Sequence, residues 1–323
     1  MEDVLVGNNG AASGSRILIT GGAGYVGCAL TAKLLELGHT VVVFDNLMSG
    51  GRGILPFFAH PNFEFVKGDV RNKEQLRETA KGADYIVHLA AIVGYPACKR
   101  EPRLAEETNI DGTMNLLAVR APSQRIIYAS TGSNYGAYSG GMCTEDTPLN
   151  PVSLYGTSKT RAEMAIMKAG NALSFRFATA FGVSPRMRLD LLINDFVYRA
   201  LREKSLILYE KEFKRTFIHV RDMARSFAFA IDNFEKMKNE VFNVGSETMN
   251  FSKQEIAEKI KTKIPFYLHF AEVGKDEDQR NYEVSYEKIR KHGLTTTIDV
   301  DQGIDELIKA CAVIDLKTEF SNV

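Results

Sequence analysis

Short apolar runs alternate with helical patterns along the first half of the chain. The apolar runs are rich in β-branched residues and end at turns, as buried strands do, and they cover residues 16–20, 40–45, 63–69, 84–91 and 124–131. Apolar residues recur at helical spacing in residues 25–38, 74–82 and 104–120. This order predicts an α/β fold, a doubly wound parallel sheet that binds ligands at the carboxyl ends of its strands.

The order of elements loosens after about Phe181. We expect a loop and a helix in residues 182–205, another helix in 217–234, a buried strand in 240–246, and two amphipathic helices around a polar loop in the tail. This pattern indicates a second, smaller α/β domain interleaved with the first. The expected division is a disordered tail at 1–15, a larger domain at 16–180 plus about 214–245, and a smaller one at about 181–213 plus 246–323.

Composition narrows the class of protein. The 323 residues include 40 Lys plus Arg and 40 Asp plus Glu, so no global charge attracts nucleic acid or an anionic membrane. We find no apolar run of membrane-spanning length and no signal-peptide pattern. The four cysteines show no metal-ligand spacing. We therefore expect a reduced, cytoplasmic protein without a metal, in which any anion is held by a local site.

A glycine-rich turn follows the first predicted strand. Gly21, Gly24 and Gly27 are spaced three apart in ITGGAGYVG and lead into a helix. Such glycines allow a tight turn, a close approach of the backbone to a pyrophosphate, and close packing of the helix on the strand. Amides at the helix start then hold the phosphates. The turn therefore predicts a dinucleotide site.

Two carboxylates extend this prediction. Asp45 ends the second strand, where it can accept both hydroxyls of the adenosine ribose. It repels a 2′-phosphate and has no arginine beside it in sequence, so we expect NAD rather than NADP. Asp69 ends the third strand and is expected near the adenine. The alternatives are a solvated turn carboxylate for Asp45, and a turn or helix-capping role for Asp69.

A tyrosine and a lysine four residues apart carry the candidate chemistry. In YGTSK, Tyr155 and Lys159 share one face of a predicted helix. A phenol with a pKa of about 10 is a poor base, but a nearby ammonium and a positive nicotinamide ring stabilise the phenolate. Tyr155 can then remove a hydroxyl proton while hydride leaves the same carbon. At the preceding strand end, Thr131 is better placed than Ser130 or Ser133 to bond the substrate oxygen. The alternative is a surface Tyr and Lys beside a Ser- and Thr-rich turn.

These motifs together resemble the extended short-chain dehydrogenases/reductases that act on nucleotide sugars. The resemblance runs from about Arg16 to the C-terminus, on TGGAGYVG, HLAA, STGSNYG, YGTSK, RTFIHVRD and FNVGS. It implies a Rossmann-type domain that binds NAD and a smaller C-terminal domain that binds a nucleoside-diphosphate sugar. It also implies a homodimer that pairs through helices including the one that carries Tyr155.

The resemblance assigns roles by position. The catalytic residues are Thr131, Tyr155 and Lys159. The cofactor-binding residues are Gly21, Gly24, Tyr25, Val26, Gly27, Asp45, Asn46, Asp69, Val70, Leu89, Ala90, Ala91, Tyr155 and Lys159. The substrate-binding residues are Thr131, Ser133, Tyr155, Asn194, Arg215 and Arg280.

Within the family, the segments SPRMRLDLLINDFVYRA and IVGYPACKREPRLA look most similar to GDP-manno-heptose 4-dehydrogenases of capsule synthesis. We therefore expect NAD-dependent oxidation at C4 of a nucleoside-diphosphate sugar, giving a 4-keto sugar for surface polysaccharide. One alternative is a 4-epimerase resembling UDP-glucose 4-epimerase, which returns the hydride. Another is a non-catalytic NAD-binding sensor or scaffold, against which the intact Thr, Tyr and Lys set argues.

Two further reactions of the family are disfavoured. Its 4,6-dehydratases carry an acidic pair just after the catalytic threonine, and Gly132 and Ser133 occupy those positions here. Without a general acid there, elimination of water is not expected. Cys143 is expected to be structural rather than catalytic, because it has no histidine nearby in sequence.

Overall fold

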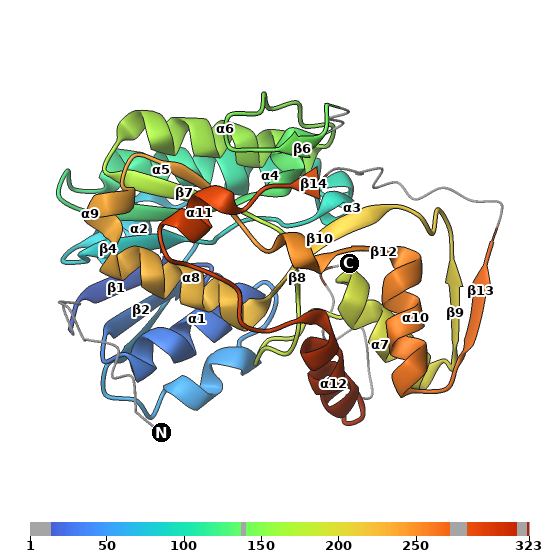
Figure 1. The fold of residues 1–323 in the computed structure, drawn as a ribbon. Helices are drawn as coiled ribbons and strands as arrows, with labels where there is room; N and C mark the ends of the chain where they lie inside the picture. Colours follow the sequence, from blue (N-terminus) through green and yellow to red (C-terminus); the bar gives the residue numbers. More distant parts are fainter. Residues whose placement is uncertain (1–13, 137–139, 272–282, 315–321, 323) are drawn as a thin grey trace, which may run out of the picture.

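Seven parallel strands form the centre of the larger lobe of the protein. The computed structural model describes residues 14–136, 140–271, 283–314 and 322. The strands run in the order β11-β7-β5-β4-β1-β2-β3 (Figure 1). Their bounds are β1 Arg16–Thr20, β2 Thr40–Asp45, β3 Phe63–Lys67, β4 Tyr85–His88, β5 Arg125–Thr131, β7 Ala172–Phe177 and β11 Val241–Val244. The predicted doubly wound parallel sheet is confirmed.

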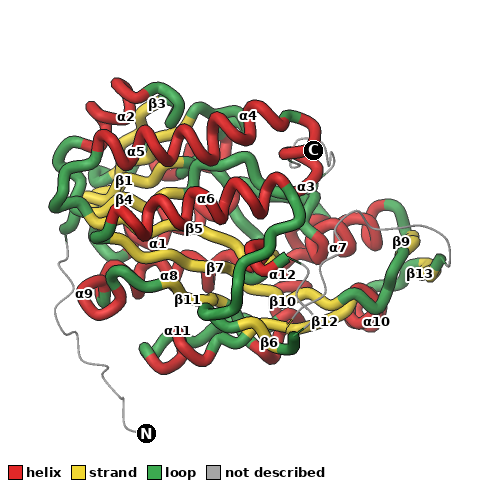
Figure 2. The backbone as a smooth tube through the Cα atoms, turned by 90° about the horizontal axis from the view of Figure 1, so that it is seen from above, coloured by secondary structure: helices red, strands yellow, loops and turns green. Residues whose placement is uncertain are grey.

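Both faces of this sheet are buried, which explains why its strands are continuously apolar. In β1, Ile17 and Ile19 pack into one core, while Leu18 between them packs into the core on the opposite face. Helices α1 and α8 cover the first face, and α2, α5 and α6 lie side by side over the second (Figure 2). Their bounds are α1 Tyr25–Glu36, α2 Lys73–Ala80, α5 Gly112–Val119, α6 Leu154–Ala169 and α8 Val220–Asp232.

The smaller lobe has an apolar core of its own, built on three helices and a pair of parallel strands. These elements are α7 Leu192–Arg202, α10 Lys253–Lys263, α12 Val300–Cys311, β9 Ser205–Leu208 and β13 Tyr267–Phe270. Short strands lie between the lobes: β8 Thr179–Phe181, β10 Lys214–His219 and β12 Asn250–Ser252 form one sheet, and β6 Met142–Cys143 pairs with β14 Glu283–Val284. Figure 1 shows this lobe at one end of the sheet.

Some elements differ from the sequence prediction. The helix expected over 217–234 is the end of β10 followed by α8, because the ring of His219 accepts a hydrogen bond from the Arg221 amide and starts the helix there. The helix expected over 104–120 contains a π-helical stretch, Glu107–Asp111, between α4 Pro102–Glu106 and α5. The described fold also contains short helices α3 Tyr95–Arg100, α9 Phe234–Met237 and α11 Glu287–Lys291, and 3₁₀-helical turns at Arg52–Phe57, Gly132–Tyr135 and Glu247–Met249.

The boundaries of the lobes also differ in part from the expected division. Val284, Tyr286, Ile289 and Leu294 pack into a core of the larger lobe, although they follow residue 246. At the other end, Ser15 is buried and its carbonyl accepts a hydrogen bond from the Thr40 amide, so the fold begins inside the expected tail. The rest of that tail, residues 1–13, lies outside the described residues.

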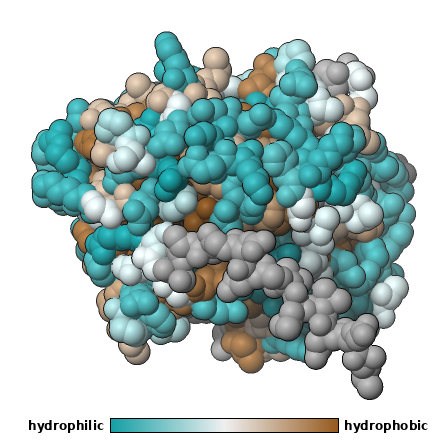
Figure 3. Space-filling view, turned by 60° about the vertical axis from the view of Figure 1, so that its left-hand side comes forward, coloured by the Kyte–Doolittle hydropathy of each residue, from teal (hydrophilic) through white to brown (hydrophobic). Residues whose placement is uncertain are grey.

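The face of the protein seen in Figure 3 is mostly hydrophilic, with smaller apolar patches between the hydrophilic residues. Within the described residues, no helix is both long enough and apolar enough to cross a membrane.

Candidate active site

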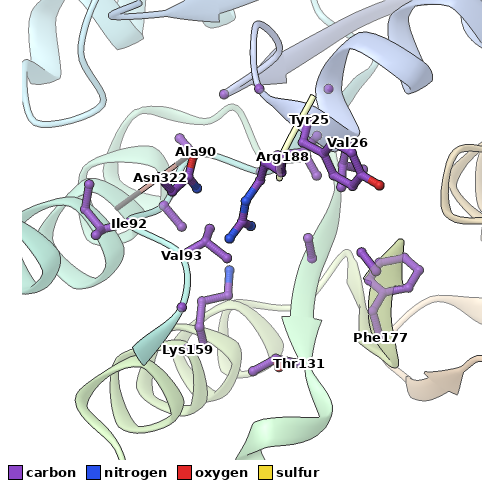
Figure 4. A pocket seen from close by; sticks show the side chains of 18 of the residues that line it. Tyr25, Val26, Ala90, Ile92, Val93, Thr131, Lys159, Phe177, Arg188 and Asn322 are labelled. Atoms are coloured by element: carbon purple, nitrogen blue, oxygen red, sulfur yellow. The ribbon is translucent and has the colours of Figure 1, made fainter. Parts of the chain in front are cut away.

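A cavity of about 310 Å³ lies at the carboxyl ends of the central strands. In a doubly wound sheet this is the expected place for a ligand, since the chain leaves neighbouring strands β1 and β4 toward opposite faces. Most of the expected site residues line it: Gly21, Gly24, Tyr25, Val26, Gly27, Asp45, Asn46, Asp69, Val70, Leu89, Ala90, Ala91, Thr131, Ser133, Tyr155, Lys159 and Arg215. The fold therefore brings the predicted cofactor and catalytic residues into one site (Figure 4).

The glycine-rich turn fits a dinucleotide. Gly21 has φ of 74°, and a Cβ there would lie 2.7 Å from the Ala90 nitrogen. A Cβ on Gly27 would lie 2.5 Å from the Gly22 Cα, so only glycine lets α1 pack so closely on the turn. Helix α1 starts without a side-chain cap. Its first amides are therefore free of an internal side-chain acceptor and suit a phosphate.

Asp45 is held in place for a ribose. Its Oδ2 accepts a hydrogen bond from the Ala23 amide at 3.0 Å and its Oδ1 accepts one from Leu47 at 2.7 Å. A carboxylate has about four lone-pair sites, so both oxygens keep capacity for hydroxyl donors. Burial is the largest influence on this carboxyl and raises its pKa.

Asp69 lies at the neighbouring strand end. It forms an ion pair with Arg71 at 2.8 Å and accepts a hydrogen bond from Asn46 at 3.0 Å. The hydrogen bond from Arg71 is the main reason that the pKa of Asp69 falls to about 2. Asp69 is therefore an anion at the cavity edge, fixed by its own neighbours.

The candidate catalytic side chains come from β5 and α6. Thr131 ends β5, and its Oγ1 accepts from the Ser133 amide at 3.1 Å and donates to the Ser133 Oγ at 3.1 Å. Ser153 caps the start of α6 by accepting a backbone hydrogen bond at 3.1 Å. Tyr155 and Lys159 then lie one turn apart and both line the cavity. Figure 4 shows Lys159 and Thr131 beside each other.

Lys159 is almost completely buried, at 3% exposure, and its Nζ lies 4.1 Å from the centre of the Tyr128 ring. Burial lowers its pKa from 10.5 to about 7, against the opposing influences of Glu163 and Cys98. Burial, and secondarily Lys159 itself, lower the pKa of His88 to about 3. The ammonium thus depends on an aromatic ring and one carboxylate to remain charged.

This shift makes stability depend on pH. We expect Lys159→Met to raise the free energy of unfolding of the nucleotide-free protein at pH 7, by several kcal/mol at most. Between pH 7 and 10.5 the unfolded wild type binds more protons than the folded one. The free energy of unfolding of the wild type therefore rises with pH across this range relative to that of the variant. The difference between the two free energies closes near pH 10.5. Urea unfolding at several pH values measures it, and a gap independent of pH would contradict the assignment.

One expected substrate residue, Asn194, is not in the cavity lining. Asn194 is fully buried; its Nδ2 donates to the Arg188 carbonyl at 2.9 Å and its Oδ1 accepts from the Gly182 amide at 2.9 Å. Because its side-chain amide bonds the backbone at Gly182 and Arg188, Asn194 supports the loop that carries Arg188 and does not face the cavity. Arg280 lies outside the described residues. Arg215 does line the cavity, at 7% exposure, and donates to the Lys214 carbonyl.

Two other side chains have structural roles. The Tyr25 hydroxyl donates to the Gly182 carbonyl at 2.7 Å, so its phenol joins the glycine-rich turn to a loop of the smaller lobe. Cys143 is buried in β6, and burial raises the pKa of its thiol to about 11. A thiol in this state is a poor nucleophile at neutral pH. No cluster of metal-ligating side chains occurs within the described part of the chain.

Sequence reasoning missed two arginines in the cavity. Arg186 and Arg188 both line it, and Arg188 forms an ion pair with Asp190 at 2.5 Å. The sequence feature that could have indicated them is the alternation of apolar and basic residues from 186 to 189. Met187 and Leu189 pack into the core of the smaller lobe, so the residues that alternate with them point the other way, toward the cavity. In Figure 4 the Arg188 guanidinium is directed toward the Lys159 ammonium.

Comparison with known proteins shows that this chain is similar to a protein family, to individual proteins and to solved structures. Residues 17–245 match the NAD dependent epimerase/dehydratase family. A UDP-glucose 4-epimerase of Corynebacterium glutamicum is 29% identical over 251 residues, 72% of this chain and 75% of that protein.

Two solved structures are similar over most of the chain. The UDP-glucose 4-epimerase of Thermotoga maritima, with UDP-glucose, has a TM-score of 0.81 at 26% identity and covers 91% of this chain and 97% of that one. The dTDP-glucose 4,6-dehydratase of Bacillus anthracis, in complex with NAD, has a TM-score of 0.79 at 27% identity and covers 91% and 96%.

These findings confirm the expected enzyme class, its extended short-chain dehydrogenase/reductase fold and its NAD cofactor. The relatives are similar beyond the family match, into the smaller lobe, and the glycine-rich turn, Asp45 and the Tyr155 helix lie in one cavity. The chain belongs to the NAD dependent epimerase/dehydratase family.

Proposed function

We propose that the protein oxidises C4 of a nucleoside-diphosphate sugar and returns the hydride to the opposite face, acting as a 4-epimerase. The observation that carries this proposal is the convergence of Thr131, Tyr155 and Lys159 on the cavity that also contains the glycine-rich turn. Relatives named UDP-glucose 4-epimerase support the epimerase alternative better than net dehydrogenation.

The side chains divide the chemistry among them. Thr131 bonds the substrate oxygen and holds the C4 hydroxyl near Tyr155. Tyr155 removes the hydroxyl proton, and the nearby Lys159 ammonium stabilises the phenolate that results. NAD, when bound, supplies the acceptor for the C4 hydrogen as hydride. Arg215, 7% exposed in the cavity lining, attracts the sugar diphosphate.

Elimination of water is not part of this proposal. Gly132 and Ser133 follow Thr131, and the Ser133 hydroxyl accepts a hydrogen bond from Thr131. A hydroxyl with an ordinary alcohol pKa is a far weaker general acid than a carboxylic acid. The sugar therefore keeps its C6 oxygen, unlike the substrate of a 4,6-dehydratase.

A second candidate is net oxidation of a GDP-linked heptose, which was the first expectation from the sequence. The two segments that carry that resemblance both line the cavity, one through Ile92 and Val93 and the other through Arg186 and Arg188. If these segments contact the sugar and determine which substrate binds, their resemblance to GDP-manno-heptose 4-dehydrogenases would be explained. Specificity for GDP-manno-heptose stays a prediction.

One experiment separates the candidates. UDP-glucose, GDP-manno-heptose and related sugars are added in turn to the NAD-loaded protein, and reduced nicotinamide is followed by near-ultraviolet absorbance. We expect no lasting rise, together with inversion at C4 of one sugar by NMR. A lasting rise with a ketone product would instead establish the dehydrogenase. Tight NAD binding without affinity for any nucleotide sugar would leave the non-catalytic alternative.

The homodimer also stays a prediction. Met114 on α5 and Met164 on α6 are 50% and 63% exposed, and these neighbouring helices lie over the same face of the sheet (Figure 2). Exposed large apolar side chains on adjacent helices suit a helix-to-helix interface. Sedimentation at micromolar concentration measures the state.

A further inference from the structure

We infer that Arg186, supplied by the loop that enters the smaller lobe, holds the pyrophosphate of NAD. Arg186 follows β8 in sequence, outside the glycine-rich turn and the nucleotide-binding strands β1 to β3. It lines the cavity and is 7% exposed. The cofactor would thus be held from two sides, by backbone amides of one lobe and by a guanidinium at the border of the other.

The first argument is an unbalanced buried charge. Arg188 has Asp190 as its ion-pair partner at 2.5 Å, but within the described ranges Arg186 forms no ion pair with a carboxylate. Its Nη2 donates to the Asn322 side-chain oxygen at 2.7 Å, and its buried Nε has no partner among the described residues. Burial, followed by the charge of Arg188, lowers the pKa of Arg186 against the smaller opposing influences of Asp190 and Asp45, yet a guanidinium stays protonated in proteins. A bound anion would remove this cost.

The second argument is position. The charge of Arg186 acts on Asp45, the expected ribose ligand, and also on Cys28 in the first turns of α1. The charge of Arg188 also acts on Arg186, and Figure 4 shows the Arg188 guanidinium directed toward Lys159, at the expected nicotinamide end. Arg186 is therefore close to the group expected at the adenosine ribose and, through Arg188, to the group expected at the nicotinamide ribose. In NAD, the group between those two riboses is the pyrophosphate.

The third argument is close docking of the Arg186 backbone on the nucleotide-binding lobe. A Cβ on Gly53 would lie 2.7 Å from the Cys28 Sγ of α1, 2.8 Å from the Arg186 Cβ and 2.9 Å from the Arg186 backbone nitrogen. Any larger residue at position 53 would push this segment away. By contrast, a Cβ on Gly51 would meet nothing nearer than the Leu47 side chain at 3.4 Å. Gly53 thus lets Arg186 approach the cofactor site.

The test is NAD affinity measured by calorimetry on nucleotide-free protein. We expect Arg186→Gln to bind NAD roughly 10- to 100-fold more weakly, the effect of losing a charge-assisted contact. Arg199→Gln is the matched control, since Arg199 lies on α7 and pairs there with Glu203. It should bind NAD like wild type. Unfolding by urea checks that both variants are folded.

Two further probes distinguish other sources of the anion. UDP is titrated into NAD-saturated protein, and NADP is titrated into nucleotide-free protein. Unchanged NAD affinity with weakened UDP binding would overturn the inference, because Arg186 would then serve the substrate diphosphate. Unchanged NAD affinity with weakened NADP binding would overturn it in favour of a 2′-phosphate contact. Unchanged binding of all three would overturn it outright.

A pair of glycine variants tests the docking step independently. Gly53→Ala should weaken NAD binding in the same direction as Arg186→Gln, because the added methyl group forces Cys28 of α1 and the Arg186 backbone apart. Gly51→Ala should bind NAD with wild-type affinity. Equal NAD affinities for the two variants would contradict the docking argument. These binding measurements require no turnover, so their failure is distinct from failure of the proposed 4-epimerase reaction.

Discussion

Tyr155→Phe is expected to lower kcat by about 10²- to 10⁴-fold, the usual contribution of a positioned proton-transfer group. The substitution removes only the phenol oxygen, so the ring still lines the cavity. NAD affinity should therefore stay within a few-fold of wild type. Turnover of the sugar identified by NMR, together with NAD calorimetry, measures both effects.

Tyr267→Phe is the control for this experiment. Tyr267 is 65% exposed on β13 of the smaller lobe, far in the fold from α6, and its substitution should leave kcat unchanged. If Tyr155→Phe retained wild-type turnover, another group would be the base and the proposed mechanism would be wrong. If both kcat and NAD affinity collapsed, the tyrosine would serve binding rather than proton transfer.

Glu163→Gln is expected to lower the free energy of unfolding by about 3–5 kcal/mol, because it leaves a buried guanidinium without its counter-charge. Glu163 lies on α6 one turn after Lys159 and pairs with Arg176 on β7 at 2.7 Å. Both side chains are at most 6% exposed. The carboxylate also accepts from the Ser174 hydroxyl at 3.0 Å. Urea unfolding of the nucleotide-free protein measures the loss.

An exposed ion pair provides the comparison. Glu203 pairs with Arg199 at 3.0 Å, but its side chain is 47% exposed. Glu203→Gln should therefore cost only about 0–1 kcal/mol. A similar small cost for Glu163→Gln would show that the pair does not hold α6 on the sheet. Because Glu163 also favours the charged form of Lys159, its substitution is expected to lower the pKa of that lysine further.

The buried pair connects stability to the candidate site. Glu163 and Lys159 lie on neighbouring turns of α6, so the contact with β7 sets where the Lys159 ammonium lies. The Tyr128 ring, from β5, contacts the same ammonium at 4.1 Å. Two strands of the sheet thus position the helix that carries the candidate catalytic residues Tyr155 and Lys159. Rigid strands are a better support for such a site than loops.

Local patterns in the sequence determined the sheet and the part of the site that the larger lobe supplies. Continuous apolar runs such as 16–20 predict strands buried on both faces, and three glycines after the first run predict the nucleotide turn. Asp45 and Thr131 each end a strand, and Tyr155 and Lys159 lie in the first two turns of α6. Because the carboxyl ends of parallel strands meet at one edge, these residues could be grouped without coordinates.

Tertiary structure alone decided the contribution of the smaller lobe. Arg186 and Arg188 come from an irregular loop, and nothing local shows that it folds back over the nucleotide turn. Asn194 is of a residue type that can bind a ligand, but its side-chain amide forms hydrogen bonds with the backbone of that loop. The sequence by itself therefore determined which residues lie at strand ends, since that follows from periodicity. The packing of the two lobes decided which charged side chains from distant segments face these strand ends. That packing depends on long-range contacts, which cannot be derived from local periodicity.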